Sequence, residues 1–134
     1  LFNLIGVINK DIIDKSEIIN NISDQEIDVL YIFKRFGGDF GISKKFCFLK
    51  TIIEYHEDQI LIKCKSIPYL GNINASPLLC EETTFSATNL NNSHVTIEYD
   101  FKVGIEEELP IYMENILGML MKKVFNNFKL FIEN

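Results

Sequence analysis

The clearest pattern of hydrophobic and polar positions lies in the C-terminal part of the chain. Apolar and polar residues alternate strictly over residues 94–103, which predicts a strand with one buried and one solvent-facing side. The longest amphipathic run follows at residues 109–132 and predicts a long helix with an apolar stripe. Such a helix over a one-sided antiparallel sheet is typical of a two-layer α+β domain. We expect the functional site between the two layers.

The predicted C-terminal helix has a defined apolar face and a defined start. Its apolar stripe recurs at three- and four-residue spacing and contains Met113, Ile116, Leu117, Leu120, Val124, Phe128 and Phe131. The acidic residues 106–108 suit the positive end of a helix dipole, and Pro110 suits a first turn. Gly118 interrupts the run, which indicates a close approach or a slight bend.

A period of two predicts antiparallel hairpins in the middle of the chain. The first runs through residues 29–33, turns at residues 37–39 and returns through residues 40–42. The second pairs residues 46–55 with residues 59–66. The connection at residues 67–77 is long and contains two prolines and a glycine, so we expect it to form a lid or a rim.

The last hairpin, residues 78–88 and 94–103, can be aligned by its pattern. Apolar partners share one face when Ala87 pairs with Val95, Phe85 with Ile97 and Thr83 with Tyr99. The same register turns Glu81 inward, opposite Phe101. A buried, unpaired carboxylate costs several kcal/mol when ionised, so Glu81 is either a functional group near a cavity mouth or is turned to solvent by a bulge. The pattern leaves both open.

Two short helices are predicted at the N-terminus. Residues 1–8 are apolar at helical spacing, and residues 14–19 open with Asp14 and Glu17, a spacing typical of a helix start. The apolar residues of 1–8 are dense enough that a first strand remains the alternative.

Length and charge limit the possible classes of protein. With 134 residues, of which 47% are hydrophobic, the chain predicts a single domain, 1–134, with a large core and room for a cavity. The net charge of −6 disfavours a nucleic-acid partner. No apolar run approaches the roughly twenty residues of a membrane span, and residues 1–8 lack the features of a signal peptide.

The chemistry-bearing residues show no catalytic or metal signature. Cys47, Cys64 and Cys80 match neither a disulfide framework nor a zinc motif, so we interpret them as reduced core thiols of a cytoplasmic protein. His56 and His94 lie at predicted hairpin ends and are expected to be exposed. We expect no metal and no cofactor.

The order of short helices, about six antiparallel hairpin strands and one long C-terminal helix resembles the START-like superfamily, also called Bet v 1-like, SRPBCC or polyketide cyclase-like. The resemblance is carried by residues 94–103, the Glu-rich turn and residues 109–132. It implies a helix-grip fold: a curved antiparallel sheet of six to seven strands around the C-terminal helix, with two short N-terminal helices. Members also carry a strand before these helices, which here would be residues 1–8 or lie upstream. They bind lipids, sterols, aromatic polyketides or plant metabolites, and a few catalyse cyclisations or dehydrations.

Three functional hypotheses follow. The first is binding or carriage of a small, mainly apolar ligand, a lipid or an aromatic metabolite, with candidate contacts Glu81, Thr83, Phe85, Ile97, Tyr99, Phe101, Met113, Leu117, Leu120 and Met121. The second is a cyclase or dehydratase with Glu81 as acid or base and Tyr99 orienting a carbonyl. The third is a protein-interaction module or homodimer with a filled core and with Phe46 and Phe48 as outward anchors. The residues favour binding over catalysis.

Overall fold

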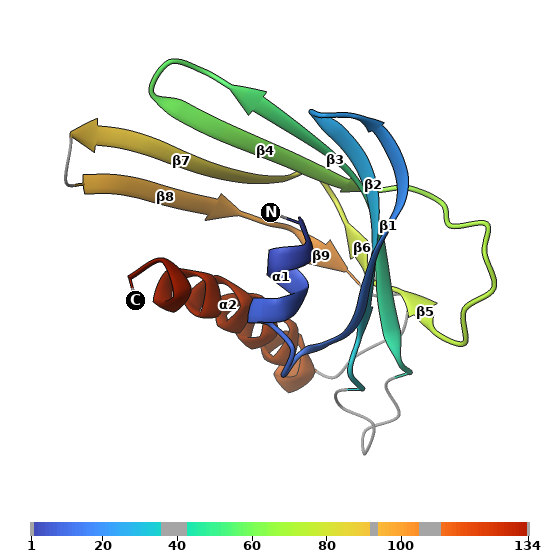
Figure 1. The fold of residues 1–134 in the computed structure, drawn as a ribbon. Coiled ribbons are helices and arrows are strands. Elements are labelled where there is room, and N and C mark those ends of the chain that lie inside the picture. The colour runs from blue at the N-terminus through green and yellow to red at the C-terminus, as the bar shows by residue number, and fades with distance from the viewer. Residues whose placement is uncertain (1, 36–42, 92–93, 105–110, 134) are drawn as a thin grey trace.

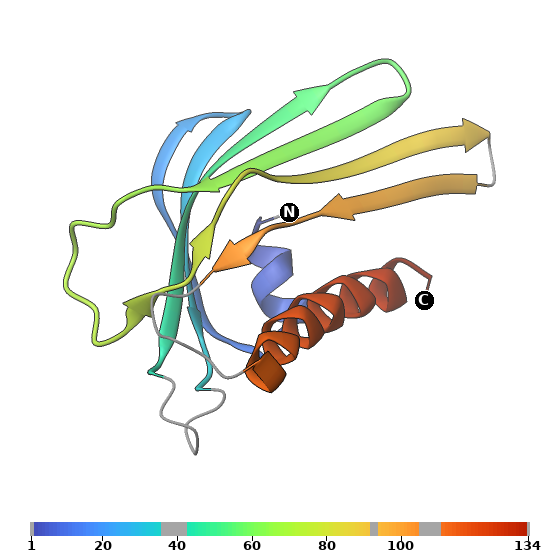
Figure 2. The same ribbon diagram turned by 180° about the vertical axis from the view of Figure 1, so that it is seen from behind.

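The computed structural model describes residues 2–35, 43–91, 94–104 and 111–133. A curved sheet wraps around one long helix, with a short helix at its open side (Figures 1 and 2). In chain order the elements are α1 (Phe2–Ile8), β1 (Ile13–Ser23), β2 (Glu26–Phe33), β3 (Lys45–Tyr55), β4 (Gln59–Ser66), β5 (Ser76–Pro77), β6 (Leu79–Cys80), β7 (Thr83–Asn91), β8 (His94–Asp100), β9 (Val103–Gly104) and α2 (Ile111–Glu133). The predicted α+β class, with a curved sheet around a C-terminal helix, is confirmed.

The main sheet has seven strands joined mostly as hairpins. The strand order is β1-β2-β3-β4-β7-β8, all antiparallel, and β5 pairs with β3 in parallel. The strands β6 and β9 form a second, two-stranded sheet. The β3–β4 hairpin agrees with the prediction, since its register runs from Leu49 opposite Ser66 to Tyr55 opposite Ile60. The predicted turn at 37–39 and the predicted helix start at 106–110 lie outside the described residues.

Only one helix is found at the N-terminus. Residues 2–8 form α1, as predicted, and are not a strand. The second predicted helix, residues 14–19, is wrong because these residues belong to β1, an edge strand paired with β2. Irregularities in the β1–β2 register at three places break the alternation that would otherwise mark a strand. Gly6 lets α1 lie against this strand, since a Cβ there would collide with the Ser16 side chain.

The last hairpin has the predicted face but not the predicted register. Phe85 pairs with Tyr99, and Ala87 pairs with Ile97, a shift of two residues that keeps the same side chains inward. The chain also bends where one strand was predicted: β8 ends at Asp100, and β9 pairs with β6. At the bend the Glu81 amide donates to the Lys102 carbonyl oxygen at 2.9 Å. Each of the two long predicted strands, residues 78–88 and 94–103, is therefore divided between the main sheet and the two-stranded sheet.

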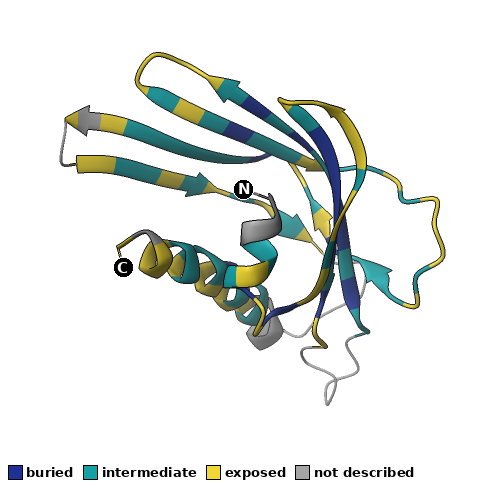
Figure 3. Ribbon diagram, in the orientation of Figure 1, coloured by how far each residue is buried: buried dark blue, intermediate teal, exposed yellow. Residues whose placement is uncertain are grey.

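Buried side chains concentrate on β2 and β3, which lie in the middle of the sheet (Figure 3). On β2 every residue from Ile27 to Tyr31 is buried, so both of its faces are covered. The main core cluster consists of Ile12, Ile13, Ile27, Val29, Tyr31, Phe33, Cys47 and Leu78. This cluster lies at the α1 side of the sheet, next to the part of α2 that contains Leu117, Leu120 and Val124.

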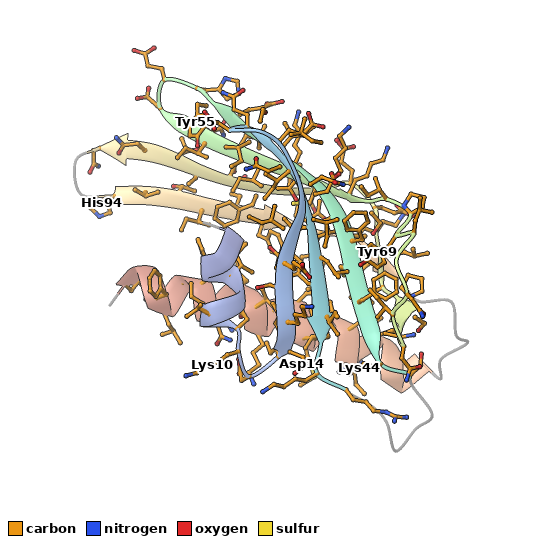
Figure 4. The ribbon with its side chains drawn as sticks, turned by 45° about the vertical axis from the view of Figure 1, so that its right-hand side comes forward. Lys10, Asp14, Lys44, Tyr55, Tyr69 and His94 are labelled. Atoms are coloured by element: carbon orange, nitrogen blue, oxygen red, sulfur yellow. The ribbon has the colours of Figure 1, made fainter. Side chains whose placement is uncertain are left out.

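The connection at residues 67–75 lies against the outer face of the sheet. Tyr69 packs edge-on against Phe48, with ring centroids 5.0 Å apart, and against Phe46 at 6.0 Å (Figure 4). A Cβ at Gly71 would collide with the Tyr69 ring, so the glycine permits this packing. The predicted lid is therefore a cover for the opposite face. Phe46 and Phe48 lie on this outer face, as the protein-interaction hypothesis requires, but Tyr69 of the same chain packs on both, which counts against a role as anchors for a partner.

Neither described helix is long and apolar enough to cross a membrane. Of the α2 side chains that the structure describes, Met121 is the buried one, at 7% exposure, while Phe131 at the end of the predicted stripe is 51% exposed. A Cβ on Gly118 would meet no atom within 4 Å, so the predicted close approach at this glycine is wrong.

Candidate ligand-binding cavity

A cavity of about 150 Å³ lies between the concave face of the sheet and α2. The strands contribute Ile13, Tyr31, Phe33, Cys47, Leu49, Thr51, Ile62, Cys64, Cys80, Thr83, Phe85, Tyr99 and Val103 to its wall. The helical side contributes Ile5, Asn9, Met121, Val124, Phe125 and Phe128. The strand residues share one parity along each strand, because side chains on alternate positions of a strand point to the same face.

Aromatic rings hold α2 away from the β7–β8 hairpin. Phe128 meets Phe85 edge to face, with ring centroids 5.2 Å apart and planes at 87°. One turn earlier, Phe125 stacks on Tyr99 at 6.2 Å and 8°. Large rings between the two layers prevent α2 from packing directly on the sheet backbone. The space beside these rings is the cavity.

On its other side α2 is fastened to α1 and to the segment that follows it. The Asn127 side-chain amide donates to Asn9 Oδ1 at 3.0 Å, and Asn9 donates to the Ile5 carbonyl oxygen at 2.9 Å. Lys123 lies 2.9 Å from Asp11, and its hydrogen bond lowers the pKa of that carboxyl group. We call Asn9, Asp11, Lys123 and Asn127 the helix clamp. Asn9, which is 1% exposed, also lines the cavity, so the clamp contacts the cavity wall.

Two phenol hydroxyls belong to residues of the cavity wall. Tyr31 is 7% exposed, and neither it nor Tyr99 makes a side-chain hydrogen bond to another described residue. Burial raises the pKa of both phenols, so both keep their proton and remain donors. A hydroxyl in an apolar site that has no hydrogen-bond partner in the protein can donate a hydrogen bond to a ligand.

A row of smaller polar side chains crosses the same wall. Thr51, Cys64 and Thr83 are cross-strand neighbours on β3, β4 and β7. The Thr51 hydroxyl donates to Cys64 Sγ at 3.7 Å, and the Thr83 hydroxyl donates to the Glu81 carbonyl oxygen at 3.3 Å. Burial raises the pKa of Cys64 to about 11. Both threonine hydroxyls therefore donate within the protein, which leaves Tyr31 and Tyr99 as the available hydroxyl donors of the described wall.

The structure brings four of the ten predicted contact residues to the cavity. Thr83, Phe85, Tyr99 and Met121 line it. Ile97 and Phe101 are half-buried on the strand side without reaching the cavity, and Leu117 and Leu120 pack on the core cluster instead. The side chain of Met113 lies outside the described part of the chain.

Glu81 is turned to solvent, the second of the two orientations that the sequence pattern left open, so it is not a cavity contact. Its side chain is 66% exposed and pairs with Lys102 at 2.9 Å. The bend between β6 and β7 rotates this position away from the face that the pattern assigned to it. The acid or base proposed for a cyclase or dehydratase is therefore absent from the cavity wall.

Several lining residues were not foreseen. Tyr31 lies on a predicted strand and Phe125 on the predicted helix, but Phe125 is not part of the predicted apolar stripe and Tyr31 is not among the predicted contacts. The three cysteines are free thiols, and Cys47 belongs to the core cluster, in agreement with their interpretation as core thiols, but all three also line the cavity. His56 is exposed at a hairpin end, as predicted, and so is His94 (Figure 4 labels His94). Within the described ranges no group of three or more His, Cys, Asp or Glu side chains could hold a metal ion.

The comparisons with known proteins match the fold and not the sequence. No family model matches the chain. No curated protein sequence matches it either. Among solved structures, human StAR-related lipid transfer protein 5 superposes with a TM-score of 0.71 at 13% identity, over 90% of this chain and 58% of that one. Human STARD10 gives 0.70 at 12% identity, over 87% and 49%.

A third solved structure is the human StarD13 (DLC2) lipid transfer and protein localization domain. It superposes with a TM-score of 0.69 at 6% identity, over 89% of this chain and 62% of that one. The chain thus spans between about half and three fifths of the length of these structures. The predicted resemblance is confirmed at the level of the fold: the chain has the START-like helix-grip fold.

Proposed function

We propose that the protein binds a small, mainly apolar molecule with one polar acceptor group in the cavity beneath α2. The observation that carries the proposal is the apolar cavity of about 150 Å³ with the hydroxyl-bearing side chains of Tyr31 and Tyr99 in its wall. The names of the structural neighbours describe lipid transfer, which agrees with an apolar ligand between the same two layers. Fold similarity alone does not choose the ligand.

The size of the cavity favours a ligand of one ring or a short chain. A dry cavity of similar volume, lined by Leu, Ile and Phe in another protein, takes up benzene. Sites for drug-sized molecules usually measure about 300–1,000 Å³. A larger lipid would need α2 to move away from the sheet, and the clamp and the two aromatic contacts resist that motion.

The polar end of the ligand is proposed to accept a hydrogen bond from Tyr31 or Tyr99. Both phenols are protonated donors because burial raises their pKa. A hydroxyl, carbonyl or ether oxygen on the ligand satisfies such a donor, whereas a carboxylate would lose much of its hydration in this apolar wall. We therefore expect neutral, oxygen-bearing ligands to bind better than carboxylic acids.

Calorimetric titration with toluene and p-cresol tests this function, since the two probes differ by one hydroxyl. The wild-type protein should bind both, with p-cresol the tighter. Tyr31→Phe or Tyr99→Phe should weaken p-cresol by about three- to tenfold, the worth of one hydrogen bond, and leave toluene unchanged. Tyr55→Phe is the matched control, because Tyr55 is 60% exposed at the far end of the β3–β4 hairpin (Figure 4).

If the wild-type protein binds neither probe, the proposed function is wrong. If both probes bind and both phenylalanine variants lose nothing, the cavity is a binding site but the tyrosines do not select its ligands.

A further inference from the structure

The three cysteines come together on one wall of the cavity, although they are far apart in the sequence. Cys47 lies on β3, Cys64 on β4 and Cys80 on β6. The sulfur atoms of Cys47 and Cys80 are 3.9 Å apart, within the range of a thiol hydrogen bond. All three are free thiols, and a disulfide would need about 2 Å between the sulfurs. The wall therefore carries a thiol pair next to a third, separate thiol.

The two members of the pair have different surroundings. Cys47 is 2% exposed and also lies 3.5 Å from the Leu78 carbonyl oxygen. Cys80 is only half-buried, and its backbone amide donates to Ser66 Oγ at 2.8 Å, which fixes the short strand β6. Cys80 is thus the more accessible sulfur, and Cys47 is the neighbour that hydrogen-bonds to it.

This pairing distinguishes the reactivity of the cysteines. The hydrogen bond between the two thiols lowers the pKa of Cys80, while the same hydrogen bond and burial raise the pKa of Cys47. Burial raises the pKa of Cys64, which keeps that thiol protonated. Because the thiolate is the reactive form, Cys80 is the nucleophile of the group. The described cavity wall contains no lysine, so these thiols are its nucleophiles.

We propose that Cys80, supported by Cys47, is a covalent attachment site for apolar ligands that carry an α,β-unsaturated carbonyl group. The proposal rests on the proposed function, because the cavity must first admit the apolar part of the ligand. The Cys80 sulfur attacks the β-carbon, a C–S bond forms, and the C=C electron pair moves to the α-carbon and carbonyl oxygen. The proton that Cys80 releases returns through water to the α-carbon. The S–H group has then been added across the double bond, and nothing is oxidised or reduced.

The test uses cinnamaldehyde, which joins one aromatic ring to an unsaturated aldehyde. The purified, reduced protein is incubated with a small excess of cinnamaldehyde, and adducts are located by peptide mass spectrometry. Dihydrocinnamaldehyde is the matched probe, since it has nearly the same shape and the same aldehyde but no electrophilic double bond. We expect one adduct on Cys80, none on Cys64 and no thiol adduct with the saturated probe.

Two variants test whether the Cys47–Cys80 pair, and not exposure alone, makes Cys80 the reactive thiol. Cys80→Ser should abolish the adduct. Cys47→Ala should slow it several-fold and move its pH dependence upward, because alanine cannot donate a hydrogen bond to Cys80. Thermal unfolding of each variant establishes that it is folded. The pH profile of the wild-type reaction needs no variant. The pH at which Cys80 is labelled at half its maximal rate should be lower than for an ordinary thiol.

Equal labelling of all three cysteines, first labelling of Cys64, or labelling only after unfolding overturns the proposal. The toluene titration described above distinguishes failure of the covalent proposal from failure of the proposed function. If toluene binds but no Cys80 adduct forms, covalent attachment alone is wrong. If neither occurs, the proposed binding function is wrong as well. An excess of toluene should also slow cinnamaldehyde labelling, and an unchanged rate would place the reaction outside the cavity.

Discussion

Asn127 is the residue of the helix clamp whose removal has the most calculable effect. Its amide donates to Asn9 Oδ1 at 3.0 Å and to Asp11 Oδ1 at 3.4 Å. Asn9 is 1% exposed, and within the described residues its Oδ1 accepts no other hydrogen bond. Asn127→Ala therefore leaves a buried acceptor unpaired and removes one of the two attachments of α2 to the segment after α1, the other being the Lys123–Asp11 pair.

The magnitude follows from the cost of that orphaned acceptor. Leaving one buried polar atom without its partner costs about 1–3 kcal/mol. Replacing Asn by Ala inside a helix returns about 0.5 kcal/mol in helix propensity, which partly hides the loss. Asn126→Ala removes the same side chain from the exposed face of the same helix and gains the same propensity. The difference between the two variants should therefore be about 1–3 kcal/mol, with Asn127→Ala the less stable.

Urea unfolding at neutral pH, followed by circular dichroism, gives the free energy of unfolding of both variants. The same difference should lower the melting temperature of Asn127→Ala by about 4–12 °C relative to Asn126→Ala. If the two variants unfold within about 0.5 kcal/mol of each other, the clamp does not hold α2. The argument that α2 resists opening toward larger ligands would then fail with it.

Three further predictions concern the rings, the glycines and pH. Phe128→Ala should destabilise the fold by about 2–4 kcal/mol and improve binding of naphthalene relative to toluene, because it removes a ring from between the layers. Phe131→Ala is the control: Phe131 is 51% exposed, so this variant should stay within about 0.5 kcal/mol of wild type. Equal effects of the two variants would contradict the spacer role of Phe128. Gly118→Ala should stabilise the protein by about 1 kcal/mol in thermal melts, because the new Cβ meets open space. Gly6→Ala should destabilise it, because the new Cβ collides with the Ser16 side chain. If Gly6→Ala were the more stable of the two variants, the described packing of α1 would be refuted. Hydrogen bonds from Lys63 and His56 lower the pKa of Glu54, so its contribution to stability is present above the usual glutamate pKa of 4.5 and is lost as the pH falls through the lower folded value. NMR titration should show the Glu54 midpoint below 4.5 in the wild type and a higher midpoint in Lys63→Met.

The regular alternation of the sheet explains why most of the fold was predictable. The β3–β4 hairpin keeps an unbroken period of two, and α2 keeps its three- and four-residue spacing on both sides of Gly118, so the positions of both were predicted closely. The strand β1 was mistaken for a helix because register shifts interrupt its alternation while Asp14 and Glu17 imitate a helix start. Long-range pairing with β2 overrides that local signal.

The candidate site was only partly predictable. The alternation of residues shows which face of a strand a side chain lies on, but not whether that side chain reaches the cavity. The pattern placed Phe85 and Tyr99 inward correctly, since a register shift of two residues preserves the face. It could not show that the chain bends at residues 81 and 101, which turned Glu81 outward, nor that Leu117 meets the core and not the cavity. The convergence of Cys47 with Cys80 depends on that same bend, so no local signal announced it.

Methyl NMR during a toluene titration addresses the central claim, that the space beneath α2 is open to an apolar guest. The methyl signals of Ile13, Leu49 and Val124, which line the cavity, should shift together and saturate with one affinity. The exposed methyl groups of Ile22 and Leu70 should not follow that curve. Shifts confined to the exposed methyl groups, or no saturable shift at all, would mean that the helix and the sheet enclose no binding site.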